Sequence, residues 1–135
     1  MRRLLRDEPV GLVGSPECLT VASSLPHGQV AAVLGTMRKL GLDGIISSKR
    51  CRQRDIILAL IAARILFPAS KLASTRRWRH CTLGSELDVL DVELDELYGA
   101  LDWLLGRQSR IEKKLAAIHL AEGGSVLYDL SSSYY

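Results

Sequence analysis

An aspartate in a β-prone segment is the residue best placed for metal chemistry. Asp129 lies in the segment VLYDLSSSYY, where strand alternation puts Tyr128 and Leu130 on one face and Asp129 on the other. Because aspartate is depleted in strands, a carboxylate fixed on a sheet at this position could be a metal ligand. An exposed acid at a strand end or in a turn is the alternative, and the residues alone leave both interpretations open.

Two basic clusters could contact the phosphates of a nucleic acid. Their members are Lys49, Arg50, Arg52 and Arg54 in the first cluster, and Arg76, Arg77 and Arg79 in the second. Positive charge at the start of a helix opposes the helix dipole, and a bound phosphate would relieve that cost. In the second cluster Trp78 lies among the bases, which suits contact with a backbone or a base. The alternatives are solvated side chains partly paired by Asp55, with Trp78 as a core residue.

Composition and charge limit the classes of protein to which this chain can belong. The chain has 135 residues, of which 47% are apolar and 24% charged, with a net charge of +3, as expected for one globular domain. The longest apolar run, Ile56–Ala63, is too short for the roughly 20 residues of a bilayer span. The three widely spaced cysteines, Cys18, Cys51 and Cys81, predict buried or half-buried thiols in a reducing cytoplasm. The segment Glu86–Glu96 holds six acids and no base, so charge is unevenly distributed.

Helical periodicity dominates the central part of the chain and predicts a mainly α fold. The sequence divides into a turn or strand segment at 1–23, a helical region at 24–120 and a β-prone end at 121–135. About five helices are expected, at 24–40, 49–67, 70–79, 91–105 and 110–121. The helix at 49–67 is apolar on nearly every side, which is typical of the buried centre of a bundle.

Caps and breaks define the ends of these helices. Ser24 with Pro26 begins the first helix and Gly41 ends it. The expected N-caps of the next three helices are Ser47 or Ser48, then Ser70, then Asp91. A break at Ser109 precedes the last helix, whose apolar residues are expected to face inward and whose bases are expected to face outward. The inward residues are Ile111, Leu115 and Ile118, and the outward ones are Arg110, Lys113 and Lys114.

The β-prone end needs a partner. A single apolar strand exposes unpaired backbone groups and is not stable alone. The strand expected after residue 124 therefore pairs either with the short strands expected in 1–23 or with a sheet that continues beyond it.

Four segments together resemble the N-terminal part of DDE-type transposases of bacterial insertion sequences. The segments are SLPHGQVAAVLGTMRKLGLD, RDIILALIAARILFPASKLAS, LDELYGALDWLLGRQSRIEKKLAAIHL and VLYDLSSSYY, in the order and spacing of that family over residues 24–135. The resemblance implies a helical N-terminal region that leads into an RNase H-like domain. Its first strand would carry the first catalytic acid at Asp129.

The resemblance also implies a metal mechanism for the complete enzyme. Three carboxylates hold two Mg²⁺ ions about 4 Å apart, which activate the attacking oxygen and stabilise the leaving one. This chain ends six residues after Asp129, so the second and third acids have no counterpart in it. We therefore expect a truncated transposase that does not cut or join DNA alone. Its expected partners are transposon-end DNA and a second copy or the full-length enzyme.

Two further hypotheses stay open beside the truncated transposase. One is a small helical DNA-binding module without catalysis, and the other is a helical protein-interaction module with no role on nucleic acid. Salt dependence separates them, because phosphate contacts make affinity fall steeply with salt concentration.

Overall fold

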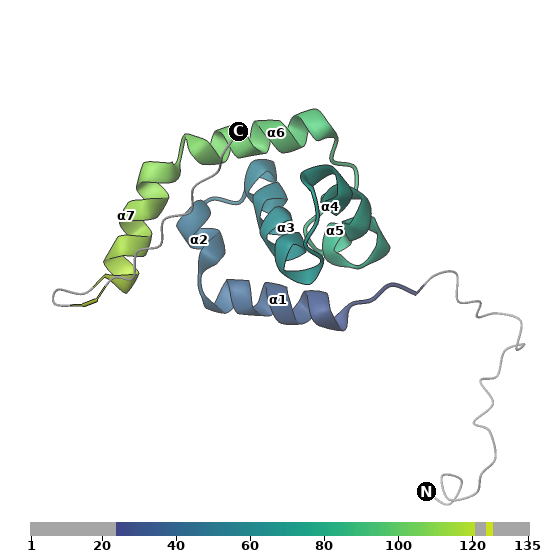
Figure 1. Cartoon of the computed structure of the whole chain (residues 1–135), viewed down its shortest axis with the longest axis horizontal. Helices are drawn as coiled ribbons and strands as arrows, with labels where there is room; N and C mark the ends of the chain where they lie inside the picture. Colours follow the sequence, from purple (N-terminus) through teal and green to yellow (C-terminus); the bar gives the residue numbers. More distant parts are fainter. Residues whose placement is uncertain (1–23, 121–123, 126–135) are drawn as a thin grey trace, which may run out of the picture.

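The structure is a computed structural model that describes residues 24–120 and 124–125. Within these residues the chain forms seven α-helices and one short 3₁₀ helix (Figure 1). They are α1 (Gly28–Lys39), α2 (Leu42–Ile46), α3 (Arg52–Leu66), α4 (Lys71–Arg77), η2 (Trp78–His80), α5 (Leu83–Glu86), α6 (Leu94–Leu105) and α7 (Gln108–His119). The predicted mainly α fold is confirmed for this part of the chain.

No strand occurs among the described residues, so neither strand prediction is supported. The strands expected in 1–23 lie outside the described residues, as do residues 126–135 with Asp129. Gly124 and Ser125, which are described, are not in a strand.

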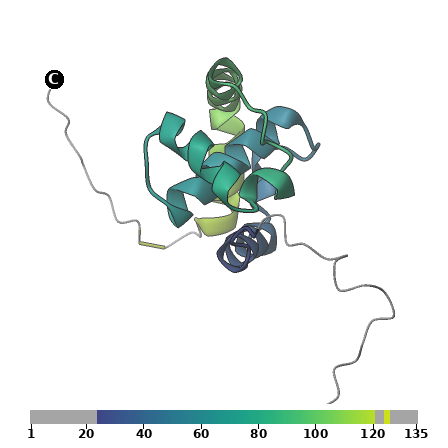
Figure 2. The same cartoon turned by 90° about the vertical axis from the view of Figure 1, so that its right-hand side faces the viewer.

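Helix α3 is the buried centre of the bundle, as its apolar pattern predicts. It packs against α1, α4, α5 and α6, and α1 and α6 lie on opposite sides of it (Figure 2). It begins at Arg52, with Cys51 as an extended N-cap residue, and ends at Leu66 before Pro68. The predicted caps Ser47 and Ser48 are wrong, because Ser47 instead ends α2.

The core is built mainly from aliphatic side chains, with one large aromatic residue. Trp78 is fully buried, which confirms the interpretation of this residue as a core residue. Cys81 is buried and Cys51 half-buried, both as free thiols, in agreement with the sequence. The largest fully buried side chains are Trp78, Ile56, Ile57, Leu83, Leu97, Val30 and Val89.

Helix α1 begins four residues later than predicted. Residues 24–27 are not helical, because the Pro26 carbonyl accepts a hydrogen bond from the Thr82 amide at 3.2 Å. His27 Nδ1 lies 2.8 Å from Thr82 Oγ1, which ties the same stretch to the start of α5. The predicted end at Gly41 is confirmed, since this residue has φ 66° in the left-handed region that glycine favours.

Two short helices were not predicted. Helix α2 lies between the helices expected at 24–40 and 49–67, and it buries Ile45 and Ile46. Helix α5 lies between the helices expected at 70–79 and 91–105. Helices of five and four residues are too short to show a periodic pattern, so tertiary packing decides them.

The N-caps of the shorter helices were predicted with mixed success. Ser70 caps α4 as expected, since its hydroxyl accepts a hydrogen bond from the Ala73 amide at 3.3 Å. The prediction of Asp91 as the N-cap of α6 is wrong: Glu93 precedes the helix, and the Asp91 carboxylate binds Arg52.

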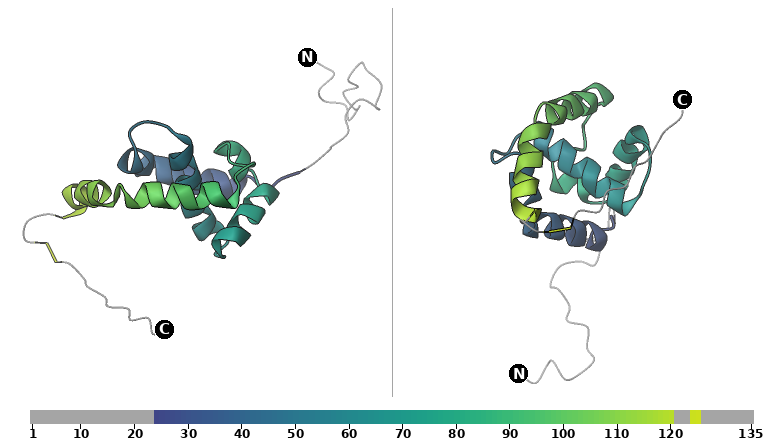
Figure 3. Two further views of the ribbon diagram at one scale, coloured as in Figure 1. Left: turned by 90° about the horizontal axis from the view of Figure 1, so that it is seen from above. Right: turned by 60° about the vertical axis from the view of Figure 1, so that its left-hand side comes forward.

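Helix α7 extends from the bundle beside α2 and α6 and buries no residue (Figure 3). It begins at Gln108, so the break predicted at Ser109 lies slightly earlier in the chain, at Gly106–Arg107. Ile118 was expected inward but is 60% exposed. Lys114 was expected outward, but its Nζ donates to the Gly44 carbonyl at 2.7 Å, because α7 packs on the end of α2.

Among residues 24–120, no single helix has both the length and the apolar character needed to cross a membrane.

Candidate nucleic-acid interface

Arg52 of the first basic cluster is bound to acidic groups of the protein. Its Nη2 lies 2.7 Å from Asp91 Oδ1 and its Nε lies 2.9 Å from Glu96 Oε1. Its Nη1 also donates to the Asp88 carbonyl. The hydrogen bonds that Arg52 donates to Glu96 and Asp91 raise the pKa of Arg52, and the bond to Asp91 lowers the pKa of that carboxyl. This guanidinium therefore joins the start of α3 to the start of α6.

Replacing Arg52 by glutamine is expected to lower the free energy of unfolding in a pH-dependent way. The pKa of Asp91 is held below its ordinary value of 3.8, so its ion pair contributes stability above that pH. That contribution is lost as pH falls through the lowered pKa. Denaturant titrations should therefore show that the difference in free energy of unfolding between wild type and R52Q is constant near neutral pH and shrinks below about pH 4. A difference that grows in acid would contradict the ion pair.

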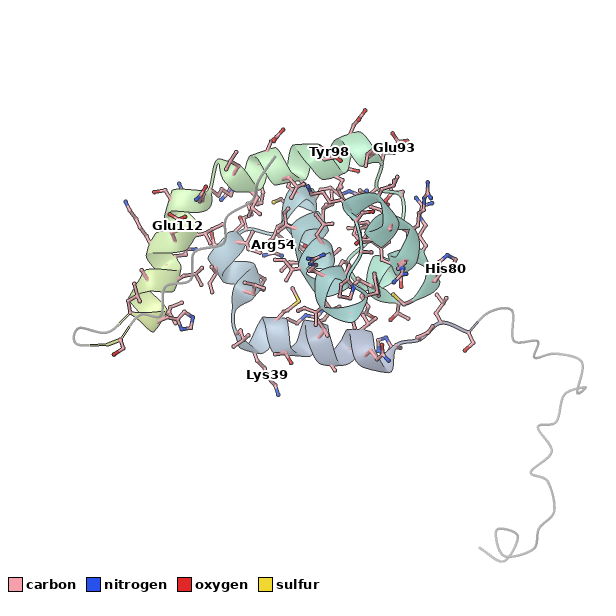
Figure 4. The ribbon with its side chains drawn as sticks, viewed as in Figure 1. Lys39, Arg54, His80, Glu93, Tyr98 and Glu112 are labelled. Atoms are coloured by element: carbon pink, nitrogen blue, oxygen red, sulfur yellow. The ribbon has the colours of Figure 1, made fainter. Side chains whose placement is uncertain are left out.

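Arg54 points into the protein between α2 and α3 (Figure 4). Only 12% of its side chain is exposed, and its Nη1 donates to the Ser47 carbonyl at 3.2 Å. Its Nε lies 3.6 Å from Asp55 Oδ1 and has no hydrogen-bond partner among the described residues. Asp55, whose side chain is 10% exposed, also accepts from Arg50 Nε at 2.8 Å. A hydrogen bond and the charge of Asp55 raise the pKa of Arg50.

A small cavity of about 160 Å³ lies beside Arg54 and Asp55. Its charged lining contains as many acids as bases, so it has no net attraction for a phosphate. The charged residues that line it are Arg38, Arg50 and Arg54, opposed by Asp43, Asp55 and Glu86.

The second cluster has a different environment. Arg76 and Arg77 lie in the last turn of α4 and Arg79 lies on η2, and all three are exposed. None of them forms an ion pair within 24–120. Trp78 is buried beneath them, so it cannot stack on a base. We call Arg76, Arg77 and Arg79 the α4–η2 arginine cluster.

A long acid-free stretch surrounds the α4–η2 arginine cluster. The thirty residues from Ile56 to Ser85 contain no Asp or Glu, and their five bases are all exposed. These bases are Arg64, Lys71, Arg76, Arg77 and Arg79. Only the last three belong to the basic clusters predicted from the sequence, although the absence of acids over this span is itself visible in the sequence.

The acidic segment 86–96 contacts the first basic cluster, because Asp91 and Glu96 pair with Arg52. The pKa of Asp91 is lowered mainly by the hydrogen bond from Arg52 and least by the charge of Arg79. Part of the uneven charge distribution in the sequence therefore reflects pairing inside the protein. Lys49 and Arg50 remain exposed at the edge of the first cluster, while Arg52 and Arg54 are bound within it.

The predicted metal ligand Asp129 lies outside the described residues. Within 24–120 and 124–125, no group of three or more His, Cys, Asp or Glu side chains could hold a metal ion. The described part of the chain therefore supplies no ligand set for the Mg²⁺ that the transposase resemblance implies. The role of Asp129 stays a prediction.

No family model, curated protein or solved structure matches this chain.

Proposed function

We propose that this chain is a fragment of a DDE-type transposase and that its helical region binds duplex DNA without cutting or joining it. In the complete transposition system, that DNA would be the transposon ends. The transposase assignment rests on the resemblance over residues 24–135. Cleavage would need two further acids besides Asp129 to hold the Mg²⁺ pair. Binding requires only the helical region.

The observation that carries the DNA-binding part of the proposal is the state of the α4–η2 arginine cluster. Three exposed guanidinium groups lie within four residues of one another and have no ion pair in the described part of the chain. Guanidinium groups contact phosphates with two parallel hydrogen bonds. A DNA backbone would thus supply the negative charge that the neighbouring residues lack.

The first basic cluster has a smaller part in this proposal than in the sequence-based prediction. Lys49 and Arg50 are its exposed members, although Arg50 already pairs with Asp55 at 2.8 Å. Arg52 and Arg54 would have to give up carboxylates and carbonyls of the protein first. We therefore assign the main contact to the α4–η2 arginine cluster, with Lys49 and Arg50 as secondary contacts.

The wild-type chain is expected to bind a short DNA duplex with strong salt dependence. Each neutralised phosphate contributes about −0.9 to the slope of log K against log salt, so three contacts predict a slope near −3. Fluorescence anisotropy of a labelled duplex between about 50 and 200 mM salt measures it. Absence of binding at the lowest salt would overturn the proposal. The protein-interaction alternative would then remain.

A further inference from the structure

An open hollow of about 250 Å³ adjoins the α4–η2 arginine cluster. It lies between the start of α1, the end of α3 and the turn from α4 into η2. Arg77 of the cluster forms part of its wall, and so does His80, three residues further on and on the same side of this turn. Figure 4 shows His80 on the side of the bundle where α1 begins. A ligand in the hollow would therefore lie next to a guanidinium that we assign to DNA phosphates.

The floor of the hollow is apolar and includes an aromatic residue. Val30 and Cys81, which line it, are buried. Leu66 and Phe67, at the end of α3, are half-buried, so part of their surface stays open to the hollow. Trp78 is buried beneath the arginines. The aromatic surface that a ligand beside the cluster can contact is therefore that of Phe67 and not that of Trp78.

The polar side chains of the hollow have no partner within residues 24–120. Gln29 and His80 are exposed, and neither side chain forms a hydrogen bond there. Arg77 forms no ion pair in the same part of the chain. None of the residues that line the hollow is an acid. An amide offers both a donor and an acceptor to the edge of a base, and a guanidinium offers donors to its phosphate.

The wall on the α1 side is held in place by hydrogen bonds across the fold. The Pro26 carbonyl accepts from the Thr82 amide at 3.2 Å, and His27 Nδ1 lies 2.8 Å from Thr82 Oγ1. A site that is formed before its ligand arrives avoids the cost of ordering it. A cavity of about 150 Å³ admits benzene, so the larger volume of this hollow suits the ring system of one base.

We propose that the hollow binds one unpaired base of a DNA strand, with Phe67 against the ring of the base and Arg77 on the adjoining phosphate. Bases within a duplex are stacked on one another, so only an unpaired or extruded base can enter. The inference rests on the proposed function, because the arginine cluster has to bring the strand to the hollow.

The combination of groups selects this ligand. An aromatic floor stacks on the face of any base, and base–aromatic stacking is a major source of affinity for single strands. A purely apolar ligand would leave Gln29 and Arg77 unused, and an acidic peptide would leave Phe67 unused. A nucleotide uses all three, since its base is flat and polar at the edge and its phosphate is negative.

The test compares three labelled DNA probes in anisotropy titrations of the full-length chain. The first is a blunt duplex, the second carries a short 3′ overhang, and the third carries the same overhang built from abasic nucleotides. The abasic overhang keeps the phosphates and lacks only the bases. Wild type should bind the intact overhang about tenfold more tightly than the abasic one. Because both carry the same phosphates, this ratio should stay nearly constant between about 50 and 200 mM salt.

Two variants locate the preference for bases at the hollow. Phe67→Leu keeps an apolar side chain and removes the ring, so it should bind the intact and abasic overhangs about equally. Tyr98→Leu is the matched control, because it removes a ring that is 49% exposed on α6, outside the hollow, and should keep the preference of wild type. Circular dichroism of both variants shows whether the helical fold is retained.

The three probes separate failure of the base site from failure of DNA binding. Equal affinity of wild type for the intact and abasic overhangs would overturn the base site, while binding of the blunt duplex would leave the proposed function in place. The same conclusion would follow if Phe67→Leu kept the preference, or if Tyr98→Leu lost it equally. If none of the probes binds at the lowest salt, both the proposed function and the base site are wrong.

Discussion

Replacing Trp78 by alanine is expected to lower the free energy of unfolding by about 3 to 5 kcal/mol. The indole is fully buried and belongs to the single core formed by α1, α3, α5 and α6. Removing it deletes the largest side chain of that core and leaves a cavity that rigid helices cannot fully close. Since domains of this size are stable by about 5 to 15 kcal/mol, this is the largest loss expected from one substitution. Urea unfolding followed by far-UV circular dichroism measures it.

Two further variants test whether the large expected loss of stability is specific to removing the Trp78 side chain. Trp103 is the other tryptophan of the chain, but it is only partly buried, beneath the guanidinium of Arg107 at 4.2 Å, so Trp103→Ala should cost less. Trp78→Phe should also cost less than Trp78→Ala. It keeps an aromatic ring and removes an indole Nε1 that has no hydrogen-bond partner among the described residues. Equal losses for Trp78→Ala and Trp103→Ala would contradict the assigned core.

Replacing Asp55 by alanine is expected to cost about 3 kcal/mol, the second-largest effect. This carboxylate lies between Arg50 and Arg54, and 10% of its side chain is exposed. Without it, Arg54 keeps one hydrogen bond, to the Ser47 carbonyl, and a buried charge with no opposite partner. Removing one member of a buried ion pair is costly because the remaining charge stays desolvated. The same urea titration measures the loss.

Arg50→Ala is the matched control for Asp55→Ala. It breaks the shorter contact to the same carboxylate, but the Arg50 side chain is 66% exposed and interacts with water in either state. We therefore expect a much smaller loss than for Asp55→Ala. A larger loss from Arg50→Ala would show that the exposed contact, rather than burial of Arg54, governs this site.

The long periodic elements of the fold were predictable and the short ones were not. The apolar pattern of α3 and the glycine at position 41 are local signals that survive in the structure. The start of α1 was missed because Thr82 binds the Pro26 carbonyl from 56 residues away. Hydrogen bonds between distant segments, and helices of four or five residues, leave no periodic trace in the sequence.

The candidate site was likewise predictable from the sequence only in part. Sequence composition located both basic clusters and the acidic segment 86–96. It could not show that part of the first cluster and the acidic segment neutralise each other, because the Arg52 contacts to Asp91 and Glu96 join residues 39 and 44 positions apart. Equally, only the packed structure shows that Trp78 is buried while the arginines on either side of it are exposed.

The most direct test of DNA binding by the α4–η2 arginine cluster compares two double variants in the anisotropy titration. Arg76→Ala with Arg77→Ala removes two bases from the last turn of α4. Arg38→Ala with Lys39→Ala removes two bases from the last turn of α1, where Lys39 points away from the bundle (Figure 4). Both pairs carry the same charge and the same favourable position relative to the helix dipole.

We expect the α4 variant to reduce the salt slope by about 0.9 for each phosphate that it no longer neutralises, while the α1 variant keeps the wild-type slope. An unchanged slope in the α4 variant, or an equal change in both, would contradict DNA binding by the α4–η2 arginine cluster.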